Sequence, residues 1–265
     1  MLLHQTKTFA VITGASSGIG AEIARLLARH GYNCILVARR EDRLRELCEE
    51  LNADEYSDGN ASYICADLKK RAGCDALMNA LEGKDVEVFV NNAGFGDCSE
   101  FINGDVDKEL DMIDLNIKSV HYLTKKMLKK RSGRTYGYIL NTASSAGLLP
   151  GGPYMATYYA TKAYVVSLTR VIAQELKESE SRLYIGALCP GPVDTEFNKN
   201  ANVEFALPGI SASECAKLAL DGMFRKKTII VPGLKLRIAC LGSRIMPVGM
   251  VMKMVSHQQK KKIYV

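Results

Sequence analysis

The chain of 265 residues has no tryptophan and only four histidines, His4, His30, His121 and His257, which lie far apart. None of the four has a neighbouring cysteine pair or acidic cluster, so we predict no metal site. No uncharged apolar run approaches the roughly 18 residues that are needed to span a bilayer. The first residues run straight into a strand pattern and lack the charged-then-apolar layout of a secretory leader.

Paired cysteines are also missing. The eight cysteines are scattered, and none belongs to a Cys-x-x-Cys motif. Scattered cysteines without a secretory leader are typical of reduced thiols. We therefore expect a cytoplasmic protein.

Acidic residues are absent from the last part of the chain. Residues 222–265 contain ten Lys or Arg residues and no Asp or Glu. The net charge of the whole chain is +6. The first 221 residues therefore sum to −4. In this basic tail a helix would gather Leu236, Leu241, Ile245, Met246, Met250 and Met254 beside Lys235, Arg237, Arg244 and Lys253. We expect this helix to pack on the substrate loop or on a neighbouring subunit. The alternative is that it docks on an anionic membrane or a lipid-like substrate. We predict no nucleic-acid partner.

What is present is an ordinary globular composition, with 47% hydrophobic and 24% charged residues. Strand and helix patterns alternate, which predicts a parallel sheet covered by helices on both faces. The expected strands are residues 8–12, 33–38, 62–66, 86–90, 138–140, 183–188 and 228–231. Helices are expected after residue 20 and over residues 41–52, 72–81, 105–131 and 211–224, with another ending at residue 176. Without a repeat or linker, residues 1–232 should form one catalytic domain and residues 233–265 an extension.

A glycine-rich turn, Thr13 to Gly20, lies between the first expected strand and the first expected helix. Its pattern is Gly-x-x-x-Gly-x-Gly, and glycines in this context let the backbone approach a pyrophosphate at a helix N-terminus. The alternative is a glycine turn without a ligand.

The second expected strand ends in Ala38, Arg39 and Arg40 instead of an acidic residue. In dinucleotide-binding folds an acid at this place binds the ribose 2′-hydroxyl, whereas an arginine accommodates a 2′-phosphate. We therefore predict a preference for NADP(H), with Arg39 as the main cause. The alternative is a solvated arginine before a charged helix.

A candidate catalytic group occupies residues 144–162. Tyr158 and Lys162 are four residues apart, so a helix would place them on one face. A lysine ammonium beside a phenol is expected to lower the phenol's pKa, which suits a general acid or base. Ser145 follows an expected strand and could hydrogen-bond a substrate oxygen. Such a pair by itself is weak evidence, because an isolated tyrosine packed under a lysine is common.

Two further stretches bear on a site. Asn116 lies inside the apolar stripe of the helix expected over residues 105–131. A buried amide must find hydrogen-bond partners, so it either caps a kink or serves a polar site. Residues 196–209 lack periodicity and resemble a loop that folds over an apolar ligand.

Together these motifs resemble the short-chain dehydrogenase/reductase family. The matching residues are Thr13-Gly14-x-x-x-Gly18-x-Gly20, Asp67, Asn91-Asn92-Ala93-Gly94, Asn116, Ser145, Tyr158-x-x-x-Lys162 and Pro190-Gly191. The resemblance covers residues 7 to 231. It implies a doubly wound, Rossmann-type α/β fold of about seven parallel strands, a nicotinamide dinucleotide cofactor and a homodimer or homotetramer.

The resemblance also implies roles for individual residues. Ser145 would hold the substrate oxygen, Tyr158 would pass it a proton, and Lys162 would bind the nicotinamide ribose. Asn116 would hold a water of the proton relay. The implied cofactor-binding residues are Gly14, Ser16, Ser17, Gly18, Ile19, Gly20, Arg39, Arg40, Asp67, Leu68, Asn92, Ala93, Gly94, Tyr158, Lys162, Pro190, Gly191, Val193 and Thr195.

The expected function is NADP(H)-dependent hydride transfer to or from a carbonyl or secondary alcohol. The tail resembles that of a family branch acting on ketones, hydroxy acids, steroids or lipid-like carbonyls, so we expect an apolar small-molecule substrate. A dinucleotide-binding regulator without turnover is the alternative. The complete set of Asn116, Ser145, Tyr158 and Lys162 argues against that alternative.

Overall fold

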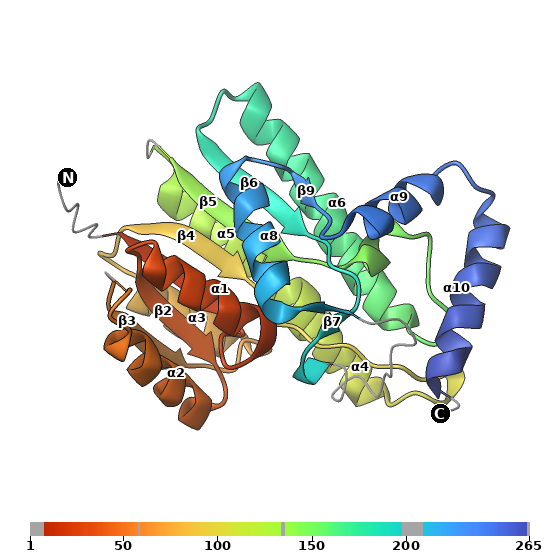
Figure 1. Cartoon of the computed structure of the whole chain (residues 1–265), viewed down its shortest axis with the longest axis horizontal. Helices are drawn as coiled ribbons and strands as arrows, with labels where there is room; N and C mark the ends of the chain where they lie inside the picture. Colours follow the sequence, from red (N-terminus) through yellow and green to blue (C-terminus); the bar gives the residue numbers. More distant parts are fainter. Residues whose placement is uncertain (1–7, 58, 134–135, 198–208, 264–265) are drawn as a thin grey trace.

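The computed structural model describes residues 8–57, 59–133, 136–197 and 209–263. Its centre is a parallel sheet of seven strands in the order β3-β2-β1-β4-β5-β6-β9 (Figure 1). The chain fills one half of the sheet from β1 outward and then returns to start the other half at β4. Ligands of such sheets bind beyond the carboxyl ends of the strands where the order reverses. The predicted doubly wound fold is therefore confirmed.

The seven strands lie within one or two residues of the predicted ranges. They are β1 (Phe9–Thr13), β2 (Asn33–Ala38), β3 (Ala61–Cys65), β4 (Val86–Asn91), β5 (Gly137–Thr142), β6 (Leu183–Leu188) and β9 (Ile229–Ile230). In β1, the side chains of Ala10, Val11 and Ile12 are all fully buried. Ala10 and Ile12 join one core cluster and Val11 joins another. Successive side chains of a strand point to opposite faces, so the sheet has a hydrophobic core on each side.

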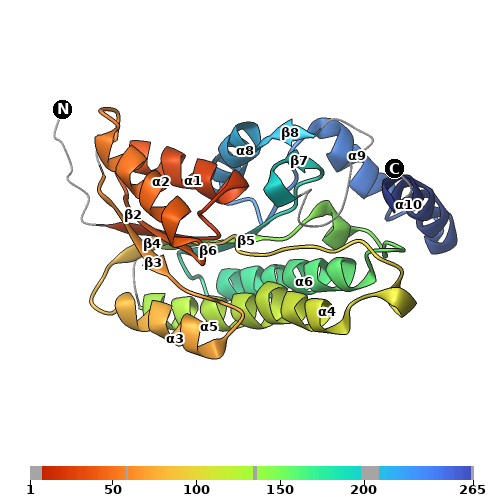
Figure 2. The ribbon, with the colours of Figure 1, turned by 90° about the horizontal axis from the view of Figure 1, so that it is seen from below.

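Helices cover both of these faces, as Figure 2 shows. One layer holds α1 (Gly18–Arg29), α2 (Glu41–Ala53) and α8 (Ala212–Phe224). The other holds α3 (Arg71–Ala80), α4 (Val106–Ile113), α5 (Val120–Arg131) and α6 (Ala156–Glu178). Helix α1 illustrates the cause, because Ile23 and Leu27 recur at helical spacing and are fully buried.

The helix predicted as one element over residues 105–131 is interrupted. A π-helical turn, Asp114–Ser119, separates α4 from α5. Such turns carry one residue more than the α-helical pattern needs and often lie at functional sites. Asn116 lies in this turn and is fully buried.

A small second sheet lies after β6. It pairs β7 (Val193–Asp194) with β8 (Ile210–Ser211) in parallel. The sequence did not predict it, because strands of two residues have no readable periodicity. Of the loop predicted over residues 196–209, residues 198–208 lie outside the described part of the chain.

Two helices follow β9: α9 (Leu234–Gly242) and α10 (Val248–Ile263). Both views place them at the end of the molecule away from β3 (Figures 1 and 2). The predicted boundary between residues 232 and 233 falls between β9 and α9. The division into a catalytic domain and an extension remains a prediction.

Candidate active site

The carboxyl ends of β1 and β4 are joined by the last residue of β1. The Thr13 hydroxyl accepts hydrogen bonds from the backbone N–H groups of Asn92 (2.9 Å) and Ala93 (3.0 Å). The Asn92 amide donates to the Thr13 carbonyl oxygen at 3.1 Å. These bonds fix the predicted Asn92–Gly94 segment against the glycine turn.

The glycine turn itself requires glycine. Gly14 and Gly18 have φ angles of 66° and 58°, a left-handed conformation that side chains disfavour. At Gly20, a Cβ atom would lie 2.4 Å from the Gly14 carbonyl oxygen. A Cβ atom at Gly18 would lie 3.1 Å from Thr195 Cγ2, so the turn meets the segment after β6. The turn opens onto the N-terminus of α1, a geometry that suits a phosphate group.

Arg40 lies against this turn. Its Nη2 donates to the hydroxyls of Ser16 (3.1 Å) and Ser17 (2.8 Å). Its Nη1 donates to Glu196 Oε2 at 2.8 Å, and this bond is the main reason that the pKa of Glu196 is lowered. Arg43 Nη2 lies 4.0 Å from Glu196 Oε1. Arg40, Arg43 and the Ser17 hydroxyl thus interact with one carboxylate. Arg39, which the sequence favoured, is exposed like Arg40.

Other predicted cofactor residues turn their side chains inward. Leu68 and Val193 are buried, and Ile19 packs against the core. Only the backbone of Leu68 and Val193 is therefore available to a cofactor. The Asp67 carboxylate accepts a hydrogen bond from the Lys69 backbone N–H at 3.2 Å.

The predicted Tyr158–Lys162 pair lies on α6, with both side chains buried. Lys162 Nζ is 5.8 Å from the centre of the Tyr158 ring and donates to the Thr142 carbonyl oxygen at 2.9 Å. Burial lowers the pKa of Lys162 to about 8. The sequence led us to expect a lowered pKa at Tyr158, but burial raises it to about 12. Desolvation of the charged form outweighs the favourable interactions at this tyrosine.

The two serines after β5 have different surroundings. Ser144 is buried, and its side chain interacts with Tyr158, an interaction that lowers the pKa of the phenol and partly offsets burial. The Ser144 hydroxyl also accepts from the Ala146 N–H at 3.1 Å. Ser145, the predicted substrate-binding serine, is half-buried and begins a 3₁₀ turn, where its backbone N–H donates to the Pro190 carbonyl oxygen at 2.8 Å. The geometry therefore favours Ser144 as the partner of Tyr158.

Asn116 links the π-helical turn to the segment after β4. Its amide nitrogen donates to the Phe95 carbonyl oxygen at 2.9 Å, and its amide oxygen accepts from the Phe95 N–H at 3.2 Å. It also donates to Thr161 Oγ1 at 3.2 Å. At Gly94, a Cβ atom would lie 2.8 Å from the Asn116 oxygen and 3.4 Å from Lys162 Nζ. Gly94, Asn116 and Lys162, all predicted as site residues, therefore lie next to one another.

Apolar side chains surround Tyr158. A cluster of buried residues joins Met112, Ala146, Met155 and Tyr158, with Phe95, Cys98, Tyr159 and Phe197 packed against it. The rings of Tyr158 and Phe197 are 5.7 Å apart. A Cβ atom at Gly96 would lie 2.8 Å from the Phe197 ring, so this position accepts only glycine unless the ring moves.

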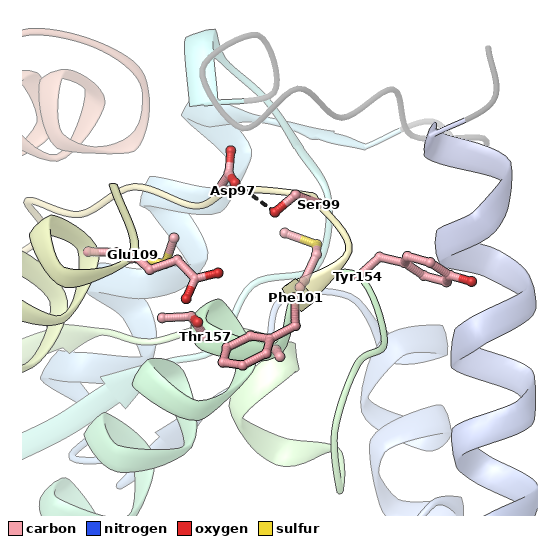
Figure 3. A pocket seen from close by; sticks show the side chains of 9 residues that line it. Asp97, Ser99, Phe101, Glu109, Tyr154 and Thr157 are labelled. Atoms are coloured by element: carbon pink, nitrogen blue, oxygen red, sulfur yellow. Dashed lines mark hydrogen bonds between the residues drawn. The ribbon is translucent and has the colours of Figure 1, made fainter. Parts of the chain in front are cut away.

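A small pocket opens beside this cluster, as shown in Figure 3. Residues of the segment after β4, of α4 and of the start of α6 line it, and their polar groups include Asp97, Glu109 and Thr157. The Ser99 hydroxyl donates to Asp97 at 3.2 Å. The Tyr154 side chain points toward α10 (Figure 3).

A glycine turn at a helix N-terminus and a buried tyrosine–lysine pair lie at the carboxyl ends of the strands of a doubly wound sheet, an arrangement typical of dinucleotide-dependent oxidoreductases. Residues 8–205 match the family model for short chain dehydrogenases. The chain belongs to the short-chain dehydrogenase/reductase family.

Two curated relatives illustrate the range of this family. An uncharacterised oxidoreductase of Staphylococcus epidermidis is 32% identical over 195 residues, which cover 73% of this chain and 81% of the relative. The 17-beta-hydroxysteroid dehydrogenase type 3 of Mus musculus is 33% identical over 204 residues, covering 76% of this chain and 65% of the relative.

Two solved structures differ in their cofactor. A short-chain dehydrogenase from Sphingobium yanoikuyae in complex with NADPH has a TM-score of 0.79 and 31% identity, covering 89% of this chain and 93% of its own. A short-chain dehydrogenase/reductase from Burkholderia phymatum in complex with NAD has a TM-score of 0.78 and 25% identity, covering 91% and 94%. Both cofactors thus occur among close structural neighbours.

Sequence reasoning missed several residues at this site. The Ser-Ser doublet signalled a hydroxyl but could not say which of the two faces Tyr158. The sequence gave no indication that Glu196 contacts Arg40, since the two residues are 156 positions apart. The sequence also could not predict the hydrogen bonds made by the Thr142 carbonyl oxygen and the Phe95 backbone, because every residue has these main-chain atoms.

Proposed function

We propose that this protein is an NADP(H)-dependent carbonyl reductase or alcohol dehydrogenase in which Tyr158 is the general acid or base. The observation that carries the proposal is the meeting of Tyr158, Ser144 and Lys162 in one buried group. A phenol with a hydroxyl on one side and an ammonium near its ring is equipped to transfer a proton to a substrate oxygen.

The residues present fit a nicotinamide dinucleotide. The glycine turn and the N-terminus of α1 suit the pyrophosphate. The Glu196 carboxylate bound by Arg40, which is also bonded to Ser16 and Ser17, supports this fit, since it occupies a guanidinium that could bind a phosphate group. Asp67, Asn92 and Thr195 complete the proposed set. When bound, the cofactor supplies or accepts a hydride at the substrate carbon.

For carbonyl reduction, Tyr158 donates the proton that the substrate oxygen takes up. Because its pKa is raised to about 12, the phenol is protonated at neutral pH and is ready to act as an acid. Ser144 hydrogen-bonds the same substrate oxygen and orients it. Lys162, held by the Thr142 carbonyl oxygen, is still mostly charged at neutral pH and favours the phenolate that remains after the transfer.

We assign Asn116 a positioning role. Its amide is bound on both sides to the Phe95 backbone, so it holds the segment that passes Gly94 and Gly96 beside Lys162 and Tyr158. The water-binding role that the family resemblance implies is compatible with this one.

The preference for NADP(H) is attributed to Arg40 in place of Arg39. Arg40 is the arginine that contacts the glycine turn, and no acidic residue ends β2. A guanidinium binds a 2′-phosphate through charge-assisted hydrogen bonds.

The apolar cluster around Tyr158 supports an apolar ketone, steroid or lipid-like carbonyl, or the matching alcohol, as substrate. Family membership supports a homodimer or homotetramer, which light scattering can test. All eight cysteines are thiols, which supports the predicted cytoplasmic location.

The test is oxidation of NADPH, followed by absorbance, with a panel of aliphatic, aromatic and steroid ketones. Turnover of at least one bulky ketone, faster with NADPH than with NADH, is expected. Tight cofactor binding without turnover of any carbonyl or alcohol would instead favour the non-catalytic regulator.

A further inference from the structure

The outward face of α9 is apolar. Leu234, Ile238, Leu241 and Ile245 are 71%, 61%, 54% and 88% exposed. Leu234, Ile238 and Leu241 are spaced by four and three residues along α9, which places them on one side of the helix, and Ile245 follows in the turn after it. A stripe of this kind normally faces a protein core, and here it faces outward.

The opposite side of α9 is attached to the body of the protein. Cys240 is buried, and Leu236 lies against Gly191, where a Cβ atom would be 3.0 Å from Leu236 Cδ2. The exposed stripe is therefore held away from the body by packing on the other side. The sequence had assigned Leu236 to the apolar face and had not included Leu234 and Ile238.

Basic residues border this stripe. Lys235, Arg237 and Arg244 are exposed. Helical spacing places Lys235 and Arg237 on opposite flanks of the stripe, and Arg244 lies in the turn after α9. On α10, the side chains of Val248, Met250, Lys253 and Met254 are also exposed. Residues 222–265 contain no acidic side chain.

We propose that this surface, defined by Leu234, Ile238, Leu241 and Ile245 with their basic neighbours, docks on an anionic lipid membrane. A helix with an apolar stripe and basic flanks lies in the plane of a membrane interface, with the stripe in the acyl boundary and the cations at the headgroups. Among the residues that the structure describes, no helix is long and apolar enough to cross a membrane. The contact is thus peripheral.

The charge of this surface favours an anionic membrane over a second copy of the chain as its partner. A two-fold contact through this surface would bring Lys235, Arg237 and Arg244 toward the same residues of the other copy, without acidic partners from the tail. Anionic headgroups instead complement both the apolar stripe and its flanks. The proposal does not depend on the proposed enzyme activity.

The experiment is flotation of the full chain with vesicles of phosphatidylcholine alone and of phosphatidylcholine mixed with phosphatidylglycerol, each at low and high salt. Binding is expected only to the mixed vesicles and should weaken at high salt, because salt screens exposed charges. Ile238→Ser with Ile245→Ser should lower binding by about tenfold or more, since apolar insertion is lost. The matched control is Val171→Ser on α6, whose side chain is 55% exposed.

A second pair of variants tests the charges. Arg237→Gln with Arg244→Gln should lower binding on the order of tenfold, whereas Lys125→Gln with Lys129→Gln on α5 should leave it unchanged. Thermal unfolding checks that each variant is folded. Absence of binding to the mixed vesicles, or equal losses in the control variants, overturns the proposal. If the variant with Ile238→Ser and Ile245→Ser instead dissociates an oligomer, and the wild-type chain does not bind vesicles, the surface contacts a second copy of the chain.

Discussion

Arg40 and Glu196 form an ion pair across the glycine turn, with Nη1 and Oε2 2.8 Å apart. Their side chains are 44% and 42% exposed. An exposed pair of this kind contributes only about 0–1 kcal/mol. It is therefore easily displaced, and a 2′-phosphate that binds Arg40 must compete with the Glu196 carboxylate for the guanidinium.

This competition predicts opposite effects of two variants on cofactor use. Arg40→Ala should lower the NADPH preference by roughly tenfold or more, because a charge-assisted hydrogen bond contributes about 1.5–3 kcal/mol. Glu196→Gln should raise NADPH affinity and leave NADH affinity nearly unchanged. The measurement is kcat/KM with each cofactor, and Arg39→Ala is the matched control. A larger loss of preference in Arg39→Ala than in Arg40→Ala would return the role to Arg39.

Tyr158→Phe should lower kcat by about 10²–10⁴-fold, because the ring keeps its packing and loses the proton. Cofactor affinity, measured by fluorescence titration, should stay close to that of the wild type. Tyr159→Phe is the control, since the Tyr159 hydroxyl accepts a hydrogen bond from Gln259 on α10 at 2.9 Å. A Tyr158→Phe enzyme that keeps more than about a tenth of the wild-type kcat contradicts the assignment.

Ser144→Ala and Ser145→Ala should differ. Removal of a hydrogen-bond donor to a developing oxyanion costs on the order of 10²–10³ in kcat, and we expect a loss of this size for Ser144→Ala. Ser145→Ala should remain within a few-fold of wild type, as its described hydrogen bond comes from the main chain. The reverse result would assign the substrate oxygen to Ser145, as the sequence suggested.

Lys162 should make stability depend on pH. The pKa of its ammonium falls from 10.5 in the unfolded chain to about 8 in the folded protein. Between these values the unfolded chain binds more protons, so the contribution of Lys162 to the free energy of unfolding rises with pH and is lowest below about pH 8. At ~1.36 kcal/mol for each pKa unit, the rise is at most about 3 kcal/mol.

Lys162→Met removes that rise, and at neutral pH the variant should be more stable than wild type because it buries no charge. Urea unfolding from about pH 7 to pH 10.5 measures the difference between the two proteins. Lys125→Met, an exposed lysine on α5, controls for the loss of charge alone. Parallel curves for Lys162→Met and wild type would show that the ammonium is not desolvated.

The sequence predicts the fold well because strands of a parallel sheet are buried on both faces and form continuous apolar runs. Asn33–Ala38 and Leu183–Leu188 are runs of this kind, and both were predicted with their observed ends. The two-residue strands β7 and β8 depend on contacts between distant segments, which no local pattern records.

The sequence predicts the main residues of the candidate site but not which side chains contact one another there. Tyr158 and Lys162 were found because helical spacing is a local property. The choice between Ser144 and Ser145 depends on which hydroxyl turns inward after β5, and the choice between Arg39 and Arg40 depends on where the chain bends after β2. The raised pKa of Tyr158 results from burial by residues far along the chain, including Met112 and Phe197.

The π-helical turn at Asp114–Ser119 makes the two halves of this long helix rotationally out of phase. Each residue of an α-helix turns by about 100°, so one surplus residue shifts every later side chain by that angle. Deleting a single residue from the turn would let the helix close in regular form. It would also swing either Asn116 away from Phe95 or the buried Leu123 and Met127 away from the core. An irregularity of one residue therefore allows a single helix to serve both the core and the candidate site.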